Sequence, residues 1–263
     1  MNARTVTSLS NPTVKAVRAL HLRKEREETG LFVAEGLKNV TEGIETGHAP
    51  RILMYGRDGA DHPVLQKAIK ATQGARGEVI EVTHDILAKV SRRDNPQAVV
   101  GVFQQRFTAL AEIQPDIAPC WVALHRVRDP GNLGTIVRTA DAAGCGGVIL
   151  VGECCDPYSV EAVRATMGSI FAVPLVQASE AEFAAWRAGW PGSVVGTLLS
   201  ADKDHRTAEY RKPALVLMGN EQSGLTPDMA ALCDVNVKIP MRGRADSLNL
   251  SVATGIMIYA AAL

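Results

Sequence analysis

Aromatic side chains are few in this chain of 263 residues, at 5%, and its charges balance to a formal net charge of zero. The scarcity of Phe, Tyr and Trp argues against a single-strand binder that stacks bases on aromatic platforms. Because 46% of the residues are hydrophobic and 21% are charged, the composition also excludes a disordered chain. We expect a globular protein with one large or two modest domains.

The cysteines lack the spacing of a disulfide framework or a zinc site. They are odd in number and form no CxxC pair: Cys120, Cys145, Cys154, Cys155 and Cys233. Reduced thiols in a cytoplasmic protein without a metal are therefore expected. The N-terminus also lacks the apolar core of a signal peptide, because Asn11, Lys15 and Arg18 interrupt it.

No hydrophobic run is long enough for a comfortable membrane span. The longest stretch without a charged residue, 247–263, is too short and contains Asn249, Ser251 and Thr254. We expect a buried or subunit-contacting helix there, and no membrane association.

The fingerprints of two nucleotide-binding folds are absent as well. After Gly144 and Gly146, the position of the third glycine of GxGxxG holds Ile149, and this run precedes a strand instead of following one. The segment 218–224 lacks the lysine of a phosphate-binding P-loop. Dinucleotide binding of the Rossmann type and nucleoside triphosphate hydrolysis are therefore not expected.

The zero net charge hides an asymmetry between the two parts of the chain. Residues 1–106 carry a formal charge of +4 and residues 107–263 carry −4. Such a split is typical of a protein in which only one module meets a polyanion. Charge alone fits equally well with two unrelated solvated surfaces.

The hydrophobic pattern predicts two α/β domains, at residues 1–106 and 119–263, joined by a linker at 107–118. In the first domain, a basic helix over 12–28 precedes short strands and helices. In the second, apolar strands alternate with amphipathic helices, which favours a mainly parallel sheet covered on both faces. These strands are expected at 121–127, 147–151, 172–176, 194–199, 214–218 and 235–239.

Three segments of the second domain carry candidate functional residues. In the first, Asn132 can cap the helix that carries Arg138. In the second, glycines surround Asn220 and Glu221 after an apolar strand, which suits either a polar ligand or a simple turn.

The third segment runs from Ile239 to Ala253. Ser247 can cap the final helix there, and Asn249 falls inside its first turn among apolar neighbours, where its side chain needs a partner.

In this order, the three segments resemble the SpoU/TrmH family of the SPOUT superfamily, the RNA ribose 2'-O-methyltransferases. The resemblance covers residues 119–263. It extends to the N-terminal third, where Ser10-Asn11-Pro12 and Phe32-Val33-Ala34-Glu35-Gly36 look like the family's ribosomal-protein-like substrate-binding domain.

The resemblance implies a catalytic α/β domain with a deep trefoil knot, S-adenosylmethionine as cofactor, and a homodimer contact through the last helix. It assigns the cofactor to Thr197, Leu198, Gly219, Ile239 and Leu248. It assigns the reaction to Arg138, Asn132, Glu221, Ser247 and Asn249. RNA contacts are expected from Lys15, Arg18, Arg23 and Arg26, and the stretch 164–169 also resembles an RNA-facing family segment, although an ordinary helix end is an equal alternative.

Arg138 aligns with a family arginine often described as the base for the ribose hydroxyl. Because a guanidinium stays protonated in proteins, we expect it to hold a phosphate and stabilise negative charge at the hydroxyl. Ribosomal RNA is the expected substrate. Transfer RNA, a non-catalytic RNA-binding role and a small-molecule reaction remain alternatives, of which the last leaves the basic N-terminal domain unexplained.

Overall fold

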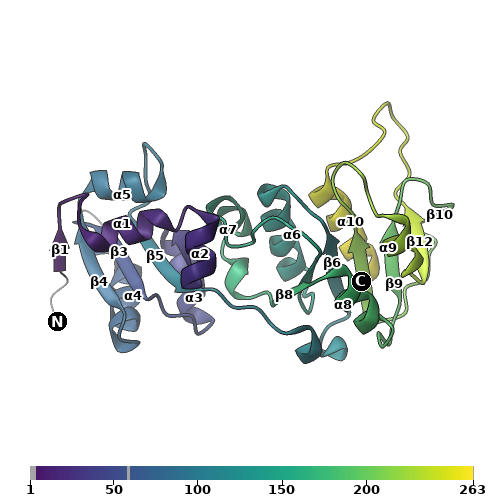
Figure 1. Cartoon of the computed structure of the whole chain (residues 1–263), viewed down its shortest axis with the longest axis horizontal. Helices are drawn as coiled ribbons and strands as arrows, with labels where there is room; N and C mark the ends of the chain where they lie inside the picture. Colours follow the sequence, from purple (N-terminus) through teal and green to yellow (C-terminus); the bar gives the residue numbers. More distant parts are fainter. Residues whose placement is uncertain (1–3, 58–59, 263) are drawn as a thin grey trace. The chain divides into compact units, whose positions relative to one another are not determined.

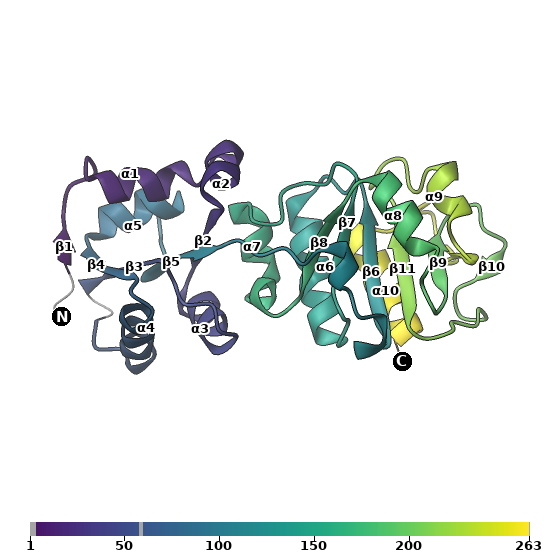
Figure 2. The same ribbon diagram turned by 60° about the horizontal axis from the view of Figure 1, so that its bottom comes forward.

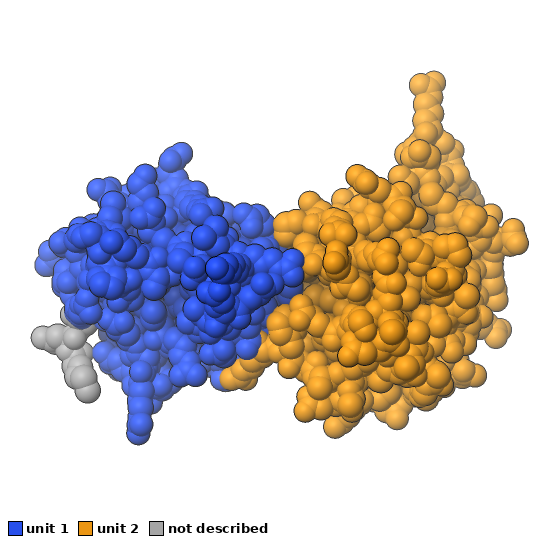
Figure 3. Space-filling model, in the orientation of Figure 1, with its two compact units in different colours: residues 1–105, 156–172 blue, residues 106–155, 173–263 orange. Residues whose placement is uncertain are grey.

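The computed structural model describes residues 4–57 and 60–262. The chain forms two compact units, coloured separately in Figure 3. Unit 1 comprises residues 1–105 and 156–172, and unit 2 comprises 106–155 and 173–263. The predicted boundaries differ from this division in two respects. The segment 156–172 folds into unit 1, although the sequence places it in the second domain, and the predicted linker 107–118 is part of unit 2.

Unit 1 is a mixed five-stranded sheet with helices on both faces. The strand order is β1-β4-β3-β5-β2, and β5 runs antiparallel to β2 and β3. The strands are β1 (Arg4–Val6), β2 (Leu31–Glu35), β3 (Ile52–Gly56), β4 (Glu78–Val82) and β5 (Val99–Gln104). Helices α1 (Pro12–Ala19) and α5 (His84–Ser91) cover one face, and α3 (Leu37–Glu45) and α4 (Pro63–Gly74) cover the other (Figure 2).

The predicted basic helix over 12–28 is two helices, α1 and α2 (Arg23–Thr29). Asn11 caps α1, with Pro12 at its first position. The chain leaves the helical path at Leu22, which has extended backbone angles, and the Leu20 carbonyl accepts a hydrogen bond from Arg26 Nη1 at 2.7 Å. Arg26 of α2 therefore satisfies a carbonyl at the end of α1.

The segment 156–172 belongs to unit 1 because it completes that unit's core. It carries α7 (Val160–Thr166), which packs against β2. Tyr158 lies 4.6 Å from Phe32 and Phe171 lies 4.7 Å from Phe103, measured between ring centroids. Aromatic pairs at such distances add to the hydrophobic stabilisation.

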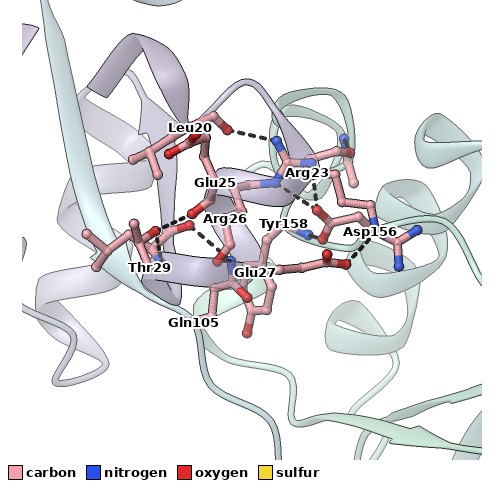
Figure 4. A network of polar contacts seen from close by, with 12 residues as sticks. Leu20, Arg23, Glu25, Arg26, Glu27, Thr29, Gln105, Asp156 and Tyr158 are labelled. Carbon is pink, nitrogen blue, oxygen red and sulfur yellow. Dashed lines mark hydrogen bonds and ion pairs between the residues drawn. The ribbon is translucent and has the colours of Figure 1, made fainter. Parts of the chain in front are cut away.

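A buried ion pair also ties this segment to unit 1 (Figure 4). Arg26 is 4% exposed, and its Nη2 lies 2.6 Å from Asp156 Oδ2. Gln105 Nε2 donates to the carbonyls of Arg26 and Leu31 at 3.1 and 3.0 Å.

Unit 2 is built on a seven-stranded sheet in which every recorded strand pair is parallel. The order is β10-β12-β9-β11-β6-β7-β8. The strands are β6 (Cys120–His125), β7 (Val148–Val151), β8 (Leu175–Ala178), β9 (Val194–Thr197), β10 (Lys203–Asp204), β11 (Ala214–Met218) and β12 (Val235–Lys238). The predicted parallel α/β architecture is therefore confirmed.

Helices cover both faces of this sheet (Figures 1 and 2). Helices α6 (Pro130–Ala142) and α10 (Leu250–Ala262) pack together on one face. Phe183 of α8 (Glu180–Arg187) and Met229 of α9 (Pro227–Ala231) join the hydrophobic core on the other. Short 3-10 helices lie at Leu110–Glu112, Pro115–Ile117 and, in unit 1, Ser169–Phe171.

Candidate active site

The candidate residues of unit 2 gather where four neighbouring strands end. In the order β12-β9-β11-β6 the strands are adjacent and parallel, so their carboxyl ends lie along one edge of the sheet. Ligands of open parallel sheets bind outside these carboxyl ends. Every candidate catalytic and cofactor residue of the sequence analysis lies in the chain segments that follow these four strands, except Thr197, which is the last residue of β9.

A cavity of about 290 Å³ lies at this edge. Its wall contains all five residues expected to contact the cofactor, Thr197, Leu198, Gly219, Ile239 and Leu248. Glu221 and Ser247 also line it. The structure thus brings together residues from three loops that are up to 51 positions apart, from Thr197 to Leu248.

The loop after β11 is shaped by Gly219. A Cβ atom at this position would lie 2.1 Å from the backbone carbon of Gly224, so no other residue fits without moving the chain. The amides and carbonyls of Asn220 and Gly224 bond reciprocally, at 3.1 and 2.9 Å. This closed turn holds Asn220 and Glu221 at the cavity wall.

Glu221 is the centre of a hydrogen-bond cluster. Its carboxylate accepts from the amides of Asp129 at 3.0 Å and Arg128 at 3.1 Å. The side-chain amides of Asn132 and Asn220 also donate to it, each at 3.4 Å. The loop after β11 is therefore fastened to the loop after β6 through one carboxylate.

The pKa of Glu221 reflects this cluster. Burial raises it, but the hydrogen bonds from the backbone at Asp129, Glu221 and Arg128 and from the Asn132 side chain together lower it by more. The result is a pKa below the ordinary value of 4.5. Glu221 is consequently an anion that accepts hydrogen bonds at neutral pH.

Asn249 extends the cluster to the last helix. Its Nδ2 donates to Asn132 Oδ1 at 2.9 Å. Its Oδ1 accepts from the amides of Ser251 and Val252 at 2.9 and 3.3 Å, so it caps α10. The predicted position of Asn249 inside the first turn is wrong by one place, because the helix begins only at Leu250.

Two other capping predictions are wrong. Asp129, not Asn132, caps α6, since its Oδ1 accepts from the Asn132 amide at 2.6 Å. Ser247 does not cap α10, because its hydroxyl donates to Asp246 Oδ1 at 3.2 Å. Both corrections release a side chain for the site: Asn132 reaches Glu221 and Asn249, and Ser247 lines the cavity.

Arg138 lies apart from this cluster. It is exposed on α6, six residues beyond Asn132, and a helix places that residue about 120° around the axis. Its guanidinium makes none of the hydrogen bonds recorded for Glu221 or Asn249. The structure therefore joins four of the five predicted catalytic residues to one cavity or cluster and leaves Arg138 on the adjacent surface.

Two residues of the site did not enter the predicted set. Asn220 Nδ2 donates to the Arg126 carbonyl at 2.8 Å, and its Oδ1 accepts from the Gln222 amide at 2.9 Å. Arg126 has a φ of 53° and donates from Nε to Glu180 Oε1 at 2.5 Å. An Asn between two glycines signals a turn, but no sequence pattern pairs Arg126 with Glu180.

The cavity wall fits S-adenosylmethionine. The Thr197 hydroxyl is buried and has no hydrogen-bond partner in the described part of the chain, so it offers a polar contact to a ligand. Leu199 is 65% exposed, and Leu248 is also an exposed apolar side chain of the wall. Apolar side chains beside backbone amides suit an adenine, and the carboxylate of Glu221 suits a cationic group.

The described residues contain no group of three or more His, Cys, Asp or Glu side chains placed to hold a metal ion. None of their helices is both long enough and apolar enough to cross a membrane.

Of the four predicted RNA contacts of unit 1, three are exposed and one is buried. Lys15 and Arg18 are exposed on α1. Arg23 is exposed, and its Nε donates to Glu27 at 2.7 Å. The prediction for Arg26 is wrong, because its guanidinium is buried against Asp156 and the Leu20 carbonyl and cannot reach a phosphate.

The stretch 164–169, similar to an RNA-facing family segment, is also engaged within unit 1. Arg164 donates from Nη2 to Glu35 Oε1 at 2.7 Å and to the Ser91 carbonyl at 2.6 Å. Helix α7 ends at Thr166, and its C-cap residue is Met167 in the left-handed region, followed by Gly168.

Comparisons with known proteins agree with this arrangement. The sequence model of the SpoU rRNA Methylase family matches residues 119–259. The model of the MRM3-like substrate binding domain matches residues 11–101.

Full-length relatives match as well. The 23S rRNA (uridine(2479)-2'-O)-methyltransferase of Streptomyces viridochromogenes is 33% identical, over 98% of this chain and 92% of its own. The 23S rRNA (guanosine(2553)-2'-O)-methyltransferase RlmP of Bacillus subtilis is 27% identical over 97% of both chains. The crystal structure of an AdoMet-bound rRNA methyltransferase from Sinorhizobium meliloti is 48% identical, with a TM-score of 0.92 over 98% of this chain and 97% of that one. This chain belongs to the SpoU rRNA Methylase family.

Proposed function

We propose that this protein transfers a methyl group from S-adenosylmethionine to a ribose 2'-hydroxyl of ribosomal RNA. One observation carries the proposal: residues expected to hold the cofactor line a single cavity, and Glu221 joins that cavity to the Asn132 and Asn249 cluster. The names of the relatives, which include 23S rRNA 2'-O-methyltransferases and an AdoMet-bound structure, support the same reaction.

The cofactor would be held by the loops after β9, β11 and β12. The backbone of Gly219 and the side chains of Ile239 and Leu248 would contact its adenine, and the Thr197 hydroxyl and the backbone at Leu198 would satisfy polar atoms. Bound there, S-adenosylmethionine supplies a methyl group already activated by its sulfonium.

The chain's own residues have to orient the acceptor hydroxyl and accommodate the loss of its proton. Asn132 and Asn249 form a rigid pair, because each is held by a second contact, to Glu221 and to α10. Their amides, together with the Ser247 hydroxyl, would position the ribose. Orientation of this kind supplies a large part of an enzyme's rate enhancement.

Arg138 would act as a fixed cation. A guanidinium binds phosphate through two parallel N–H groups, and it stabilises negative charge that develops on a nearby oxygen. Its exposure on α6 leaves it accessible to the RNA backbone. In this account it positions the phosphate beside the acceptor ribose and does not take up the proton.

We further propose that the protein is a homodimer in the cytoplasm, with α10 in the subunit contact. Val252 is 52% exposed and Tyr259 is 46% exposed, and their i, i+7 spacing puts them on one face of this uncharged helix. A monomer would leave that apolar face in water. The last residue of the uncharged run, Leu263, lies outside the described residues.

The knot implied by the family belongs to the same proposal. The strand order supports it, because β12 does not lie next to β11, which precedes it, but on the far side of β9. The chain after β11 must therefore pass β9 before it reaches the loop 239–249 and α10.

The test is product analysis after incubation of the purified protein with labelled S-adenosylmethionine and unmodified 23S rRNA. A ribose 2'-O-methyl group blocks alkaline cleavage at the next phosphate, so the label should appear in alkali-resistant dinucleotides. Label on a free base after complete digestion would overturn the proposed reaction. Labelling of transfer RNA in place of ribosomal RNA would overturn the proposed substrate.

A further inference from the structure

Unit 1 contains a second cavity, larger than the first, between helices α1 and α5. Its volume is about 530 Å³. Both helices lie on the same face of the unit 1 sheet, side by side in Figures 1 and 2. The residues that line it are Lys15, Arg18, Ala19, Ala88, Lys89, Arg92, Arg93 and Asp94.

The cavity is strongly basic, with five cations and one carboxylate in its wall. All five cationic side chains belong to exposed residues. Lys15 and Arg18 are three residues apart on α1, and Lys89 and Arg92 have the same spacing at the end of α5. The members of each pair are therefore near one another, and all four residues line the cavity.

Little negative charge within unit 1 compensates these cations. Arg93 Nε lies 3.8 Å from Glu35 Oε2, but Arg164 already holds that carboxylate with two shorter bonds, of 2.7 and 3.2 Å. No ion pair is recorded for Lys15, Arg18, Lys89 or Arg92 within the described ranges 4–57 and 60–262. Like charges facing one space repel, so an anion in the cavity would stabilise the arrangement.

Arg92 occupies a backbone conformation that favours glycine. It ends α5 with a φ of 53°, in the left-handed region. An arginine costs roughly 1 kcal/mol there compared with glycine. A residue that carries this cost and also lines the basic cavity points to a use for the side chain.

We propose that this cavity is a site for backbone phosphates of the RNA substrate, held by Lys15 and Arg18 of α1 and by Lys89, Arg92 and Arg93 of α5. The inference rests on the proposed function, which makes RNA the substrate. It adds three residues to the predicted RNA contacts, replacing the buried Arg26 and the ion-paired Arg23.

The composition of the wall favours a phosphate backbone over other ligands. Ala19 and Ala88 are small and leave room for a bulky chain, and the wall has no aromatic ring on which a base or sugar could stack. It also contains no Asn or Gln amide, the side chains that pair with adenine edges. The site should therefore position RNA without reading its sequence.

The experiment measures binding of the full-length protein to a 23S rRNA transcript at several KCl concentrations. The variant Lys89→Gln/Arg92→Gln should weaken binding about tenfold near 0.15 M salt and reduce the slope of log Kd against log[KCl] by about 1 to 2. The matched control is Lys67→Gln/Lys70→Gln, which removes two exposed lysines at the same spacing from α4, on the opposite face of the sheet. The control should keep the wild-type slope.

A second variant distinguishes the loss of the phosphate site from a folding defect. Arg92→Gly removes the guanidinium and suits the left-handed backbone, so its melting temperature should equal or exceed that of the wild type while RNA binding weakens. Normal RNA binding by Arg92→Gly and by the double variant, or an equal loss in the α4 control, would overturn the proposal. So would binding of anionic phospholipid vesicles in preference to RNA.

The two proposals can fail separately. If the two variants of the basic cavity bind RNA normally while the wild type methylates ribose, the proposed phosphate site is wrong and the proposed function stands. If these variants lose RNA binding but the wild type transfers no methyl group to RNA, the proposed function is wrong and the phosphate site stands.

Discussion

At the scale of single residues, Glu221 connects two chain segments that are more than ninety positions apart. Two backbone amides and two side-chain amides donate hydrogen bonds to its carboxylate, so a substitution that removes the carboxylate changes all four contacts. The geometry of the cavity and that of the proposed ribose site therefore depend on the same anion.

Substitution of Glu221 by Gln should abolish most methyl transfer and lower stability only slightly, by about 1 kcal/mol or less, because the residue is only partly shielded from solvent. The carboxyl's folded pKa is lowered, so its stabilising contribution is present above about pH 4.5 and is lost as the pH falls through the folded value. Wild-type unfolding free energy should thus drop more steeply below pH 4.5 than that of the variant in urea titrations. The control, Glu153→Gln, removes a highly exposed carboxylate that lies 3.7 Å from Arg128. An identical pH profile for wild type and Glu221→Gln would contradict the stabilising role of the Glu221 carboxylate.

Arg138 allows a test between positioning and proton transfer. Arg138→Ala should reduce single-turnover methyl transfer at least about a hundredfold while S-adenosylmethionine affinity stays the same, since the cavity wall does not include this residue. Arg138→Lys should leave a low rate that does not change with pH, because a point charge cannot replace the guanidinium fork. A methyl-transfer rate of the Lys variant that rises with pH would favour a base at this position. The control is Arg206→Ala, which removes an arginine paired with Asp204.

At the scale of secondary-structure elements, the residue that precedes α10 both caps this helix and belongs to the proposed ribose site. The Asn249 side chain caps the helix with its oxygen and reaches Asn132 with its nitrogen. The helix cap and the contact with Asn132 involve different atoms of Asn249, so different substitutions separate them.

Asn249→Asp should keep the cap, and with it the stability to within about 0.5 kcal/mol, because a carboxylate accepts the same amide hydrogen bonds. It should lose methyl transfer, since it has no N–H to give to Asn132. Asn249→Ala should lose both, with a cost of about 1 kcal/mol from the missing cap. Urea unfolding and initial rates on rRNA measure the two effects, and full activity of the Asp variant would show that the contact with Asn132 has no catalytic role.

Local patterns predicted the elements of unit 2 well and their ends less well. Strand β11 agrees with its prediction at both ends, because a continuous apolar run bounded by proline and glycine is unambiguous. Helix α6 begins at Pro130, three residues before the start at Leu133 that a cap at Asn132 would give, because Asp129 supplies the cap. Competing polar residues, such as Asp129 and Asn132, cannot be ranked as caps without their tertiary partners.

At the scale of the whole molecule, the membership of the segment 156–172 in unit 1 could not be predicted from the sequence. The segment 156–172 is flanked by strands of the unit 2 sheet, so local pattern assigns it to that unit. Its membership of unit 1 rests on long-range contacts, Arg26 with Asp156 and Arg164 with Glu35, each about 130 positions apart. Similarly, the residues of the proposed cofactor cavity were predicted from the family resemblance and not from hydrophobic periodicity. The basic cavity could not be predicted from the sequence, because it depends on the packing of α1 against α5.

The Arg26 ion pair should contribute strongly to the stability of unit 1. Arg26→Ala leaves Asp156 largely buried without its cation, at a cost of about 3–5 kcal/mol. Arg23→Ala, which disrupts an exposed i,i+4 pair, should cost about 0.5 kcal/mol. Hydrogen exchange of β2 and α7 should reveal the difference, with S-adenosylmethionine affinity unchanged in both variants; equal effects of the two substitutions would contradict the structural role of Arg26.

The central claim, ribose methylation of ribosomal RNA, is tested most directly in cells. Ribose 2'-O-methylation should be mapped across total RNA from the wild-type strain, a strain without this gene, and the deletion strain complemented with wild type or Arg138→Ala. The account predicts the loss of a discrete 2'-O-methyl site in ribosomal RNA, restored by the wild-type gene and not by the variant. An unchanged ribosomal RNA map in the deletion strain, or restoration by Arg138→Ala, would contradict it.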